Sequence, residues 1–224
     1  SGLYRIARGR GLLRTVYFLP YVTSAVAAGT VWRAMLDPRF GIINSLLGKA
    51  GIPAGALPQW LLEPKGVLHI VSNGMIPADL GPSLALCCVV TFDVWHTMGF
   101  MVVILLAGLT AIPRELEEAA VIDGASWRHI SLHVTLPLLS PTLFFLAIVS
   151  VIRAFQAFNS FYALTGDGSG PVNTTRNLIV YMYDFVHRPQ SLGYATAVAT
   201  LMALAVIGLT LFQWRFVGRR VYYE

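Results

Sequence analysis

The feature that most constrains this chain is an apolar run from about Pro82 to Gly108, PSLALCCVVTFDVWHTMGFMVVILLAG. A bilayer core about 30 Å thick needs about 20 mostly apolar helical residues to cross it, and this run is long enough. Three more stretches qualify, at about 16–36, 137–164 and 194–214. We therefore predict an all-α polytopic membrane protein with four spans here, forming one transmembrane domain over residues 1–224.

The composition excludes the other broad classes of protein. Of the residues, 56% are hydrophobic and only 12% charged, whereas a soluble domain carries about 25% charged residues. The two cysteines, Cys87 and Cys88, are neighbours inside the apolar run, so no disulfide framework is expected. The sequence opens at Ser1 with no signal-peptide pattern, and we expect it to be a fragment.

The basic residues between the spans predict the orientation, because cytoplasmic loops carry the excess of Lys and Arg. Nine fall on one side: Arg5, Arg8, Arg10, Arg14, Arg114, Arg128, Arg215, Arg219 and Arg220. Five fall on the other: Arg39, Lys49, Lys65, Arg176 and Arg188. We therefore expect both ends of the given chain and loop 112–136 to be cytoplasmic, and loops 37–81 and 165–193 to be external. We attribute the net charge of +5 to the basic residues that set the membrane orientation. A nucleic-acid partner is therefore not expected.

Loop 112–136 does not read as a passive connector. Pro113 stands where a helix would start, and acidic residues follow in the first turn, where the helix dipole favours them. Gly124 would end this helix, and Ser126 can cap a second one. The pattern predicts two short helices joined by a bend. The simpler alternative is a merely amphipathic helix at the membrane surface.

The same loop carries a family resemblance. Glu118-Ala119-Ala120, then Gly124 and, after nine intervening residues, Val134-Thr135-Leu136-Pro137 resemble the EAA loop of binding-protein-dependent ABC importer permeases. Val134 stands where that family has isoleucine. Flanking segments resemble the carbohydrate-uptake branch, the maltose- and glycerol-phosphate-type permeases: 14–20, Gly41-Ile42-Ile43-Asn44 with Leu47, Ala107-Gly108-Leu109, and Asp123-Gly124-Ala125.

The resemblance implies a type I ABC importer transmembrane fold in a bacterial inner membrane, with four of its six core spans in the given sequence. It implies a second homologous permease, two ATPase subunits and an extracytoplasmic solute-binding protein as partners, besides membrane lipid. The loop would couple to the ATPase: Glu118 as polar contact, Ala119 and Ala120 for close packing, and Gly124, next to Asp123, for the bend. Loop 37–81, which carries several turn signals, is either a solvated connector or a docking surface.

No catalytic pattern is visible in the sequence. The nearest approach to a phosphate loop, from Gly41 to Lys49, has six residues between its glycines instead of four, and Ala50 replaces Ser or Thr. His129 and His133 form an i,i+4 pair without a third metal ligand. We therefore expect a non-catalytic subunit that binds no cofactor or metal, with ATP and magnesium on the partner ATPase subunits.

Polar residues within the spans have two interpretations, because charges there are costly and usually face a partner or a water-filled path. Asp93 and Arg153, at similar depth, form either a packing salt bridge or part of a translocation pathway. The candidate pathway residues are Asp93, Trp95, His96, Thr97, Phe100, Arg153, Gln156 and Asn159. The alternative function is an ion-coupled secondary transporter that uses Asp93 and Arg153 as a relay.

The resemblance implies that the solute is a sugar or a glycerol-phosphate-type compound. The tail Arg219-Arg220-Val221-Tyr222-Tyr223 resembles that of glycerol-phosphate-type permeases, and Arg153 suits a phosphate. These two features slightly favour a phosphorylated glycerol compound over a neutral disaccharide such as maltose or trehalose.

Overall fold

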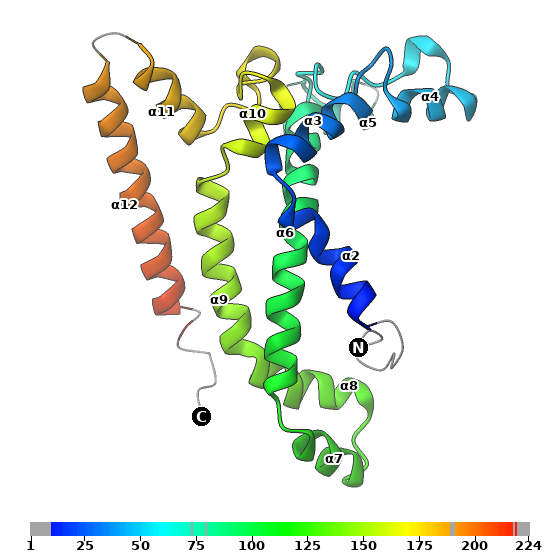
Figure 1. The fold of residues 1–224 in the computed structure, drawn as a ribbon, viewed down its shortest axis with the longest axis vertical. Helices are drawn as coiled ribbons and strands as arrows, with labels where there is room; N and C mark the ends of the chain where they lie inside the picture. Colours follow the sequence, from blue (N-terminus) through cyan, green and yellow to red (C-terminus); the bar gives the residue numbers. More distant parts are fainter. Residues whose placement is uncertain (1–9, 73, 79, 189–190, 217, 219–224) are drawn as a thin grey trace. The chain divides into compact units, whose positions relative to one another are not determined.

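The structure is a computed structural model, and it describes residues 10–72, 74–78, 80–188, 191–216 and 218 (Figure 1). Arg5, Arg8, Arg219 and Arg220, which enter the orientation argument, lie outside these residues, as does the rest of the Arg219–Tyr223 tail motif. The described residues are helical and contain no strand, only an isolated antiparallel bridge between Gly66 and Ser83.

Among the residues that the structure describes, three helices are long and apolar enough to cross a membrane. They are α6 (Leu84–Ala111), α12 (Leu192–Phe216), and a helix over Trp127–Phe155 in which α8 (Trp127–Ile130), a π-helical turn (Ser131–Thr135) and α9 (Leu136–Phe155) follow one another. Ser83 caps α6, because its Oγ accepts a hydrogen bond from the Leu86 amide at 3.0 Å.

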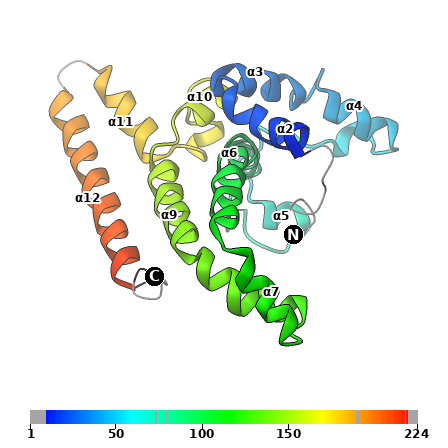
Figure 2. The same ribbon diagram turned by 60° about the horizontal axis from the view of Figure 1, so that its bottom comes forward.

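The chain divides into two compact units, each described by itself. In the unit that holds Leu19–Thr97 and Gln156–Ala199, α3 (Ala25–Met35) packs against α10 (Asn159–Thr165) (Figure 2). Gly29 makes this close approach possible, since a Cβ there would lie 2.6 Å from the Ala163 Cβ. The fully buried side chains of this core are Phe92, Leu164, Val89 and Val180.

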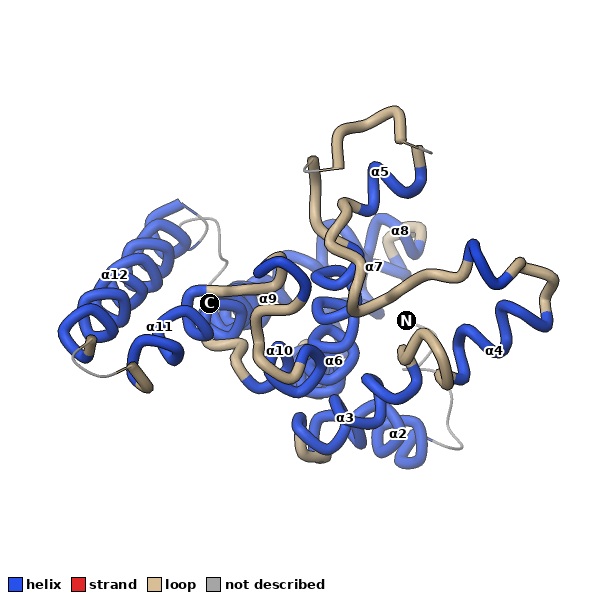
Figure 3. Tube along the Cα trace, turned by 90° about the horizontal axis from the view of Figure 1, so that it is seen from above, coloured by secondary structure: helices blue, strands red, loops and turns tan. Residues whose placement is uncertain are grey.

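The remaining elements of this unit are short. They are α4 (Ile42–Lys49), a 3₁₀ turn (Ala54–Ala56), α5 (Val67–Val71), a second 3₁₀ turn (Pro171–Asn173) and α11 (Leu178–Val186) (Figure 3). Backbone hydrogen bonds tie the α5 segment to the start of α6: the Val67 amide donates to the Pro82 carbonyl and the Leu84 amide to the Lys65 carbonyl. Gly41 stands at the N-cap position of α4.

The other unit holds Met98–Phe155 with the chain up to Phe18 and from Thr200 onward. In it, α6 approaches α9 at Gly108, where a Cβ would lie 2.5 Å from the Thr142 Oγ1. Gly99 has a similar role, since a Cβ there would lie 2.2 Å from the Tyr17 carbonyl oxygen. Small residues at such contacts are typical of helix packing in membranes.

The predicted span at 16–36 is not one helix. It consists of α2 (Arg10–Val22) and α3, and the break falls at Thr23 and Ser24. Pro20 inside α2 lacks the amide hydrogen that would bond to Val16, and the Ser24 backbone is extended, with φ −59° and ψ 125°. Each piece is shorter than the roughly 20 residues that cross a bilayer core. A crossing by this segment stays a prediction.

The helix predicted at 137–164 is displaced toward the N-terminus. It runs back from Pro137 to Trp127 through the π-helical turn, and it ends at Phe155. Pro137 cannot donate to the carbonyl of His133, and the wider turn at 131–135 lies at that carbonyl. After a break at 156–158, the chain continues as α10, with Asn177 Nδ2 donating to the Ala157 carbonyl in the break at 2.5 Å.

Candidate functional site

The segment 112–136 has the predicted helix–bend–helix form. Pro113 caps α7 (Arg114–Ile122), Glu115 and Glu117 lie in its first turn, and Gly124 follows with φ +80°. This left-handed conformation suits glycine because other residues carry a Cβ penalty there. Ser126 then caps α8, its Oγ accepting a hydrogen bond from the His129 amide at 3.4 Å. The geometry is thus dictated by Pro113, Gly124 and Ser126, as the sequence predicts.

A hollow of about 590 Å³ lies at this bend. It is lined by Ala120, Asp123, Gly124, Ala125, Ser126, His129, His133 and Val134. Three of the predicted coupling residues, Ala120, Asp123 and Gly124, therefore share one concave surface. Glu118 and Ala119 do not line it, but both are exposed on α7.

The surface around the hollow is unusually apolar for an exposed loop. Ile122 is 85% exposed, and Leu116, Val121 and Trp127 are exposed with it. Large exposed apolar side chains in one short segment favour a surface that contacts another molecule.

Asp93 is held by a neighbour that is not among the candidate pathway residues. Ser160 Oγ on α10 donates to Asp93 Oδ1 at 2.5 Å, so this bond joins α6 to α10. Ser160 is itself buried. The pairing of Asp93 with Arg153 stays a prediction.

His96 and Thr97 are both buried and bonded within their unit. His96 Nε2 lies 3.2 Å from the carbonyl oxygen of Thr23, a group that the break between α2 and α3 frees from the helical ladder. Thr97 Oγ1 donates to the Asp93 carbonyl at 2.8 Å. In this arrangement both side chains stabilise the helices that they touch, because buried polar groups need hydrogen-bond partners.

Trp95 and Phe100 lie among aromatic or cationic groups. The Trp95 ring is 5.3 Å from that of Trp32 and 6.0 Å from that of Phe92. The Arg153 guanidinium lies over the Phe100 ring, 5.9 Å from its centroid, within the range of a cation–π contact. Both aromatic residues are half-buried, so each keeps part of its surface accessible.

Gln156 and Asn159 are exposed at the break between α9 and α10. The sequence analysis missed Asn177, which satisfies this break: it bonds the Ala157 carbonyl, and its Oδ1 accepts the Val180 amide at 2.9 Å as the cap of α11. An asparagine directly before an apolar run is a helix-start signal that could have identified it. Broken helices in membrane proteins occur where the freed backbone is buried in protein or lines a cavity.

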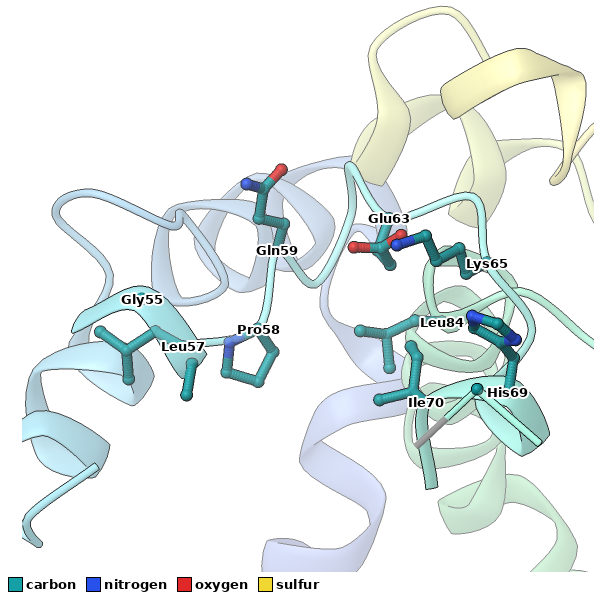
Figure 4. Close-up of a pocket in the computed structure, with 11 residues that line it drawn as sticks. Gly55, Leu57, Pro58, Gln59, Glu63, Lys65, His69, Ile70 and Leu84 are labelled. Carbon is teal, nitrogen blue, oxygen red and sulfur yellow. The ribbon is translucent and has the colours of Figure 1, made fainter. Parts of the chain in front are cut away.

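A second pocket, of about 510 Å³, lies within the segment 37–81 and the start of α6. Figure 4 shows Leu57 and Pro58 on one side of the pocket, across from His69, Ile70 and Leu84. Gln59, Glu63 and Lys65 add an amide, an acid and a base to its wall. The His69 ring is fixed by the Ile76 carbonyl oxygen, 2.5 Å from Nδ1. The pocket thus combines apolar surface with hydrogen-bonding groups and with side chains of both charges.

Two polar residues of this segment, which the sequence analysis did not single out for this role, give it a defined shape. Asn44, buried at 4% exposure, donates to the Pro38 and Pro58 carbonyls at 3.1 Å each and accepts from Trp60 Nε1 at 2.8 Å. Asp37 accepts the amides of Phe40 and Arg39, and these bonds lower the pKa of its carboxyl. These bonds order the part of the segment between Asp37 and Trp60.

His129 and His133 stack with their ring centroids 4.1 Å apart. Across the part of the chain that the structure describes, no three His, Cys, Asp or Glu side chains come together as a metal-binding group.

Residues 2–221 match the family model described as "Binding-protein-dependent transport system inner membrane component". The chain is 33% identical over 220 residues to the sn-glycerol-3-phosphate transport system permease protein UgpA of Agrobacterium fabrum, covering 98% of this chain and 67% of that protein. It is 32% identical over 212 residues to the trehalose/maltose transport system permease protein MalF of Thermococcus litoralis, covering 95% and 63%. The chain spans about two thirds of the length of these relatives.

The fold is also shared with a solved structure. A bacterial alginate ABC transporter, crystallised in complex with an alginate pentasaccharide-bound periplasmic protein, matches with a TM-score of 0.78 at 19% identity, over 100% of this chain and 70% of that one. At this identity the likeness concerns the fold, that of an ABC importer permease. Together with the match over residues 2–221, it places the chain in a multi-pass membrane protein family. The chain belongs to the family of inner-membrane components of binding-protein-dependent transport systems.

Proposed function

We propose that this chain is the permease subunit of an ATP-driven importer that takes up a sugar or a glycerol-phosphate-type solute. The observation that carries the proposal is the helix–bend–helix surface at 112–136, with its hollow and exposed apolar rim, in a chain of this transport family. A membrane protein has no reason to order such a surface in water unless another subunit covers it.

The subunit that covers it is an ATPase, and the chain itself is non-catalytic. Two ATPase subunits carry ATP and magnesium, and a second, homologous permease completes the pathway. Closure of the ATPase dimer moves α7 and α8 and thereby changes the access of the solute pathway. Glu118, exposed on α7, would accept hydrogen bonds from a basic group of the ATPase, and such charge-assisted bonds are among the strong ones.

In this proposal the 112–136 side and both ends of the given chain are cytoplasmic, and an extracytoplasmic solute-binding protein docks on the segment 37–81. The ordered pocket with Gln59, Glu63 and Lys65 supports that docking, since it offers both shape and charge to a partner. The candidate solute pathway comprises the eight residues predicted from the sequence: Asp93, Trp95, His96, Thr97, Phe100, Arg153, Gln156 and Asn159.

The coupling role is tested with Glu118→Lys in the assembled transporter, reconstituted in proteoliposomes. We expect solute uptake to be lost while the protein still inserts and ATP is still hydrolysed. Glu117→Lys is the matched control, with the same charge change on the neighbouring exposed residue of α7. Normal uptake by Glu118→Lys, or equal loss in both variants, would contradict the proposal.

The ion-coupled alternative is separated by the energy source. Uptake that continues when the proton gradient is collapsed and ATP is maintained supports the ATP-driven importer. Uptake that stops under that condition supports an ion-coupled carrier. Purification in mild detergent is a second test. The proposal requires that an ATPase subunit and a second permease co-purify in the same complex.

A further inference from the structure

The outer face of α4 has no role in the proposed transport cycle, yet the structure presents it in a defined way. Ile42 and Leu46, one helical turn apart, are 59% and 60% exposed, and Phe40, just before the helix, is 89% exposed. We call Phe40, Ile42 and Leu46 the outer face of α4. The opposite side of the helix faces inward, where Ile43 packs against the core and Asn44 is buried.

A chain of contacts fixes the depth of α4 relative to the first turns of α6. Asn44 on α4 accepts a hydrogen bond from the Trp60 indole, and the Cys88 thiol of α6 lies 3.7 Å from the Trp60 carbonyl oxygen. Cys88 is the fifth residue of α6, which puts it about 6 Å along the helix at 1.5 Å per residue. The α4 helix is therefore held at the level of the second turn of α6.

That level corresponds to the edge of the hydrocarbon layer. With 28 residues, α6 is about 42 Å long, while the hydrocarbon core is about 30 Å and the whole bilayer about 40–45 Å thick. About 6 Å of α6 at each end therefore lies among the headgroups. Figures 1 and 3 show α4 running across the direction of the first half of α6, so its axis lies along the membrane plane.

The charges around the outer face fit a lipid surface. Arg39 precedes it and Lys49 closes α4, and both are exposed. An apolar helix face with basic residues beside it binds at the boundary of headgroups and acyl chains, and the attraction is greater for anionic lipids.

We propose that α4 is an interfacial helix, with Phe40, Ile42 and Leu46 inserted at the acyl-chain boundary and Arg39 and Lys49 at the phosphates of anionic phospholipids. The inference rests on the proposed function only for the side of the membrane. An α4 anchored in this way fixes one end of the segment 37–81 and leaves its pocket side accessible to a protein.

The test uses the assembled transporter with Cys87→Ser, and with a fluorescent probe on a new cysteine at Leu46→Cys or Ile42→Cys. Cys88 is buried and is kept, so that its contact with Trp60 is retained. Gly48→Cys is the matched control: it lies on the other side of the same helix, and a Cβ there meets no atom within 4 Å. Each variant is reconstituted in phosphatidylethanolamine and phosphatidylglycerol, with and without bromine on the acyl chains. We expect bromine to quench the probes at 46 and 42 and to leave the probe at 48 bright.

Equal emission of all probes in brominated and plain lipid would overturn the proposal, since the outer face would then lie in water. Quenching at 46 that disappears when the solute-binding protein is added would also overturn it, because a protein would then cover the face. The ATP-driven uptake assay on the same vesicles is independent of these readings, so failure of the lipid contact and failure of the proposed function are distinguishable.

Discussion

At the scale of single residues, the structure uses buried and half-buried polar side chains to satisfy backbone groups that irregular segments leave open. His96 does this for the Thr23 carbonyl at the first helix break, and Asn177 for the Ala157 carbonyl at the second. Asn44 does it for two carbonyls of the segment 37–81. An unsatisfied buried polar group costs about 1–3 kcal/mol, so these residues are essential for the local folds around them.

Asn44→Ala is the sharpest test of this role. The substitution removes the partners of the Pro38 and Pro58 carbonyls and of the Trp60 indole, so we expect a loss of about 2–3 kcal/mol in unfolding free energy. The measurement is the unfolding of the detergent-solubilised complex, followed by tryptophan fluorescence. Ser45→Ala, at the exposed neighbour, is the control and should change stability little. Equal stability of both variants would mean that the bonds of Asn44 contribute nothing.

The Asp37 carboxylate predicts a pH dependence of the adjoining turn. Its bonds to the Phe40 and Arg39 amides lower its pKa from the ordinary value of 3.8. A lowered folded pKa means that the stabilisation is fully present above the ordinary value and is lost as the pH falls through the folded value. We expect the protection of these two amides against hydrogen exchange to decrease below about pH 4 in the wild type. In Asp37→Asn the protection should not vary with pH; a wild-type protection that stays constant to low pH would contradict the prediction.

At the scale of elements, local signals in the sequence predicted more than hydropathy did. The α7–α8 turn follows from Pro113, Gly124 and Ser126, which each impose a backbone geometry of their own. The helices found within 16–36 and 137–164 begin and end at other residues than these predicted spans, because a hydropathy window averages over about 20 residues and does not detect a break at one or two. The break at Thr23 and Ser24 is stabilised by His96, 73 positions away along the chain, and no local pattern contains such a partner.

The packing of α3 on α10 gives a prediction at this scale. Gly29→Ala places a Cβ 2.6 Å from the Ala163 Cβ, so we expect a destabilisation of about 1–3 kcal/mol from overpacking. Adding Ala163→Gly removes the clashing atom and should recover most of that loss. The unfolding of both variants and of the wild type is compared in the same detergent. Gly208→Ala, in α12, is the matched control, because a Cβ there meets no atom within 4 Å.

A Gly29→Ala variant as stable as the wild type would mean that α3 and α10 can separate without cost. A loss that Ala163→Gly does not reduce would mean that the Leu164 and Phe92 side chains, which also lie close to Gly29, cause it instead.

At the scale of the whole molecule, family membership identifies the fold and the class of transport system, but it does not identify the solute. Relatives with nearly equal identity are named for sn-glycerol-3-phosphate and for trehalose and maltose. A shared fold does not by itself determine the solute, so the preference of this chain is tested at the candidate pathway residues. Of the candidates, Arg153 is the one that carries a positive charge, and its guanidinium can bind a phosphate through two parallel hydrogen bonds.

We accordingly predict that the reconstituted transporter, with its own binding protein, takes up a phosphorylated glycerol compound and that Arg153→Gln lowers this uptake about tenfold or more. A charge-assisted hydrogen bond is worth about 1.5–3 kcal/mol, and about 1.4 kcal/mol corresponds to tenfold. Arg153→Lys keeps the charge but loses the planar pair of donors. Its uptake should therefore lie between that of the wild type and that of Arg153→Gln. Basal ATP hydrolysis, measured in the same vesicles, should be unchanged if the loss is one of solute binding. Uptake of maltose or trehalose in place of the phosphorylated compound, unaffected by Arg153→Gln, would assign Arg153 to helix packing through its contact with Phe100.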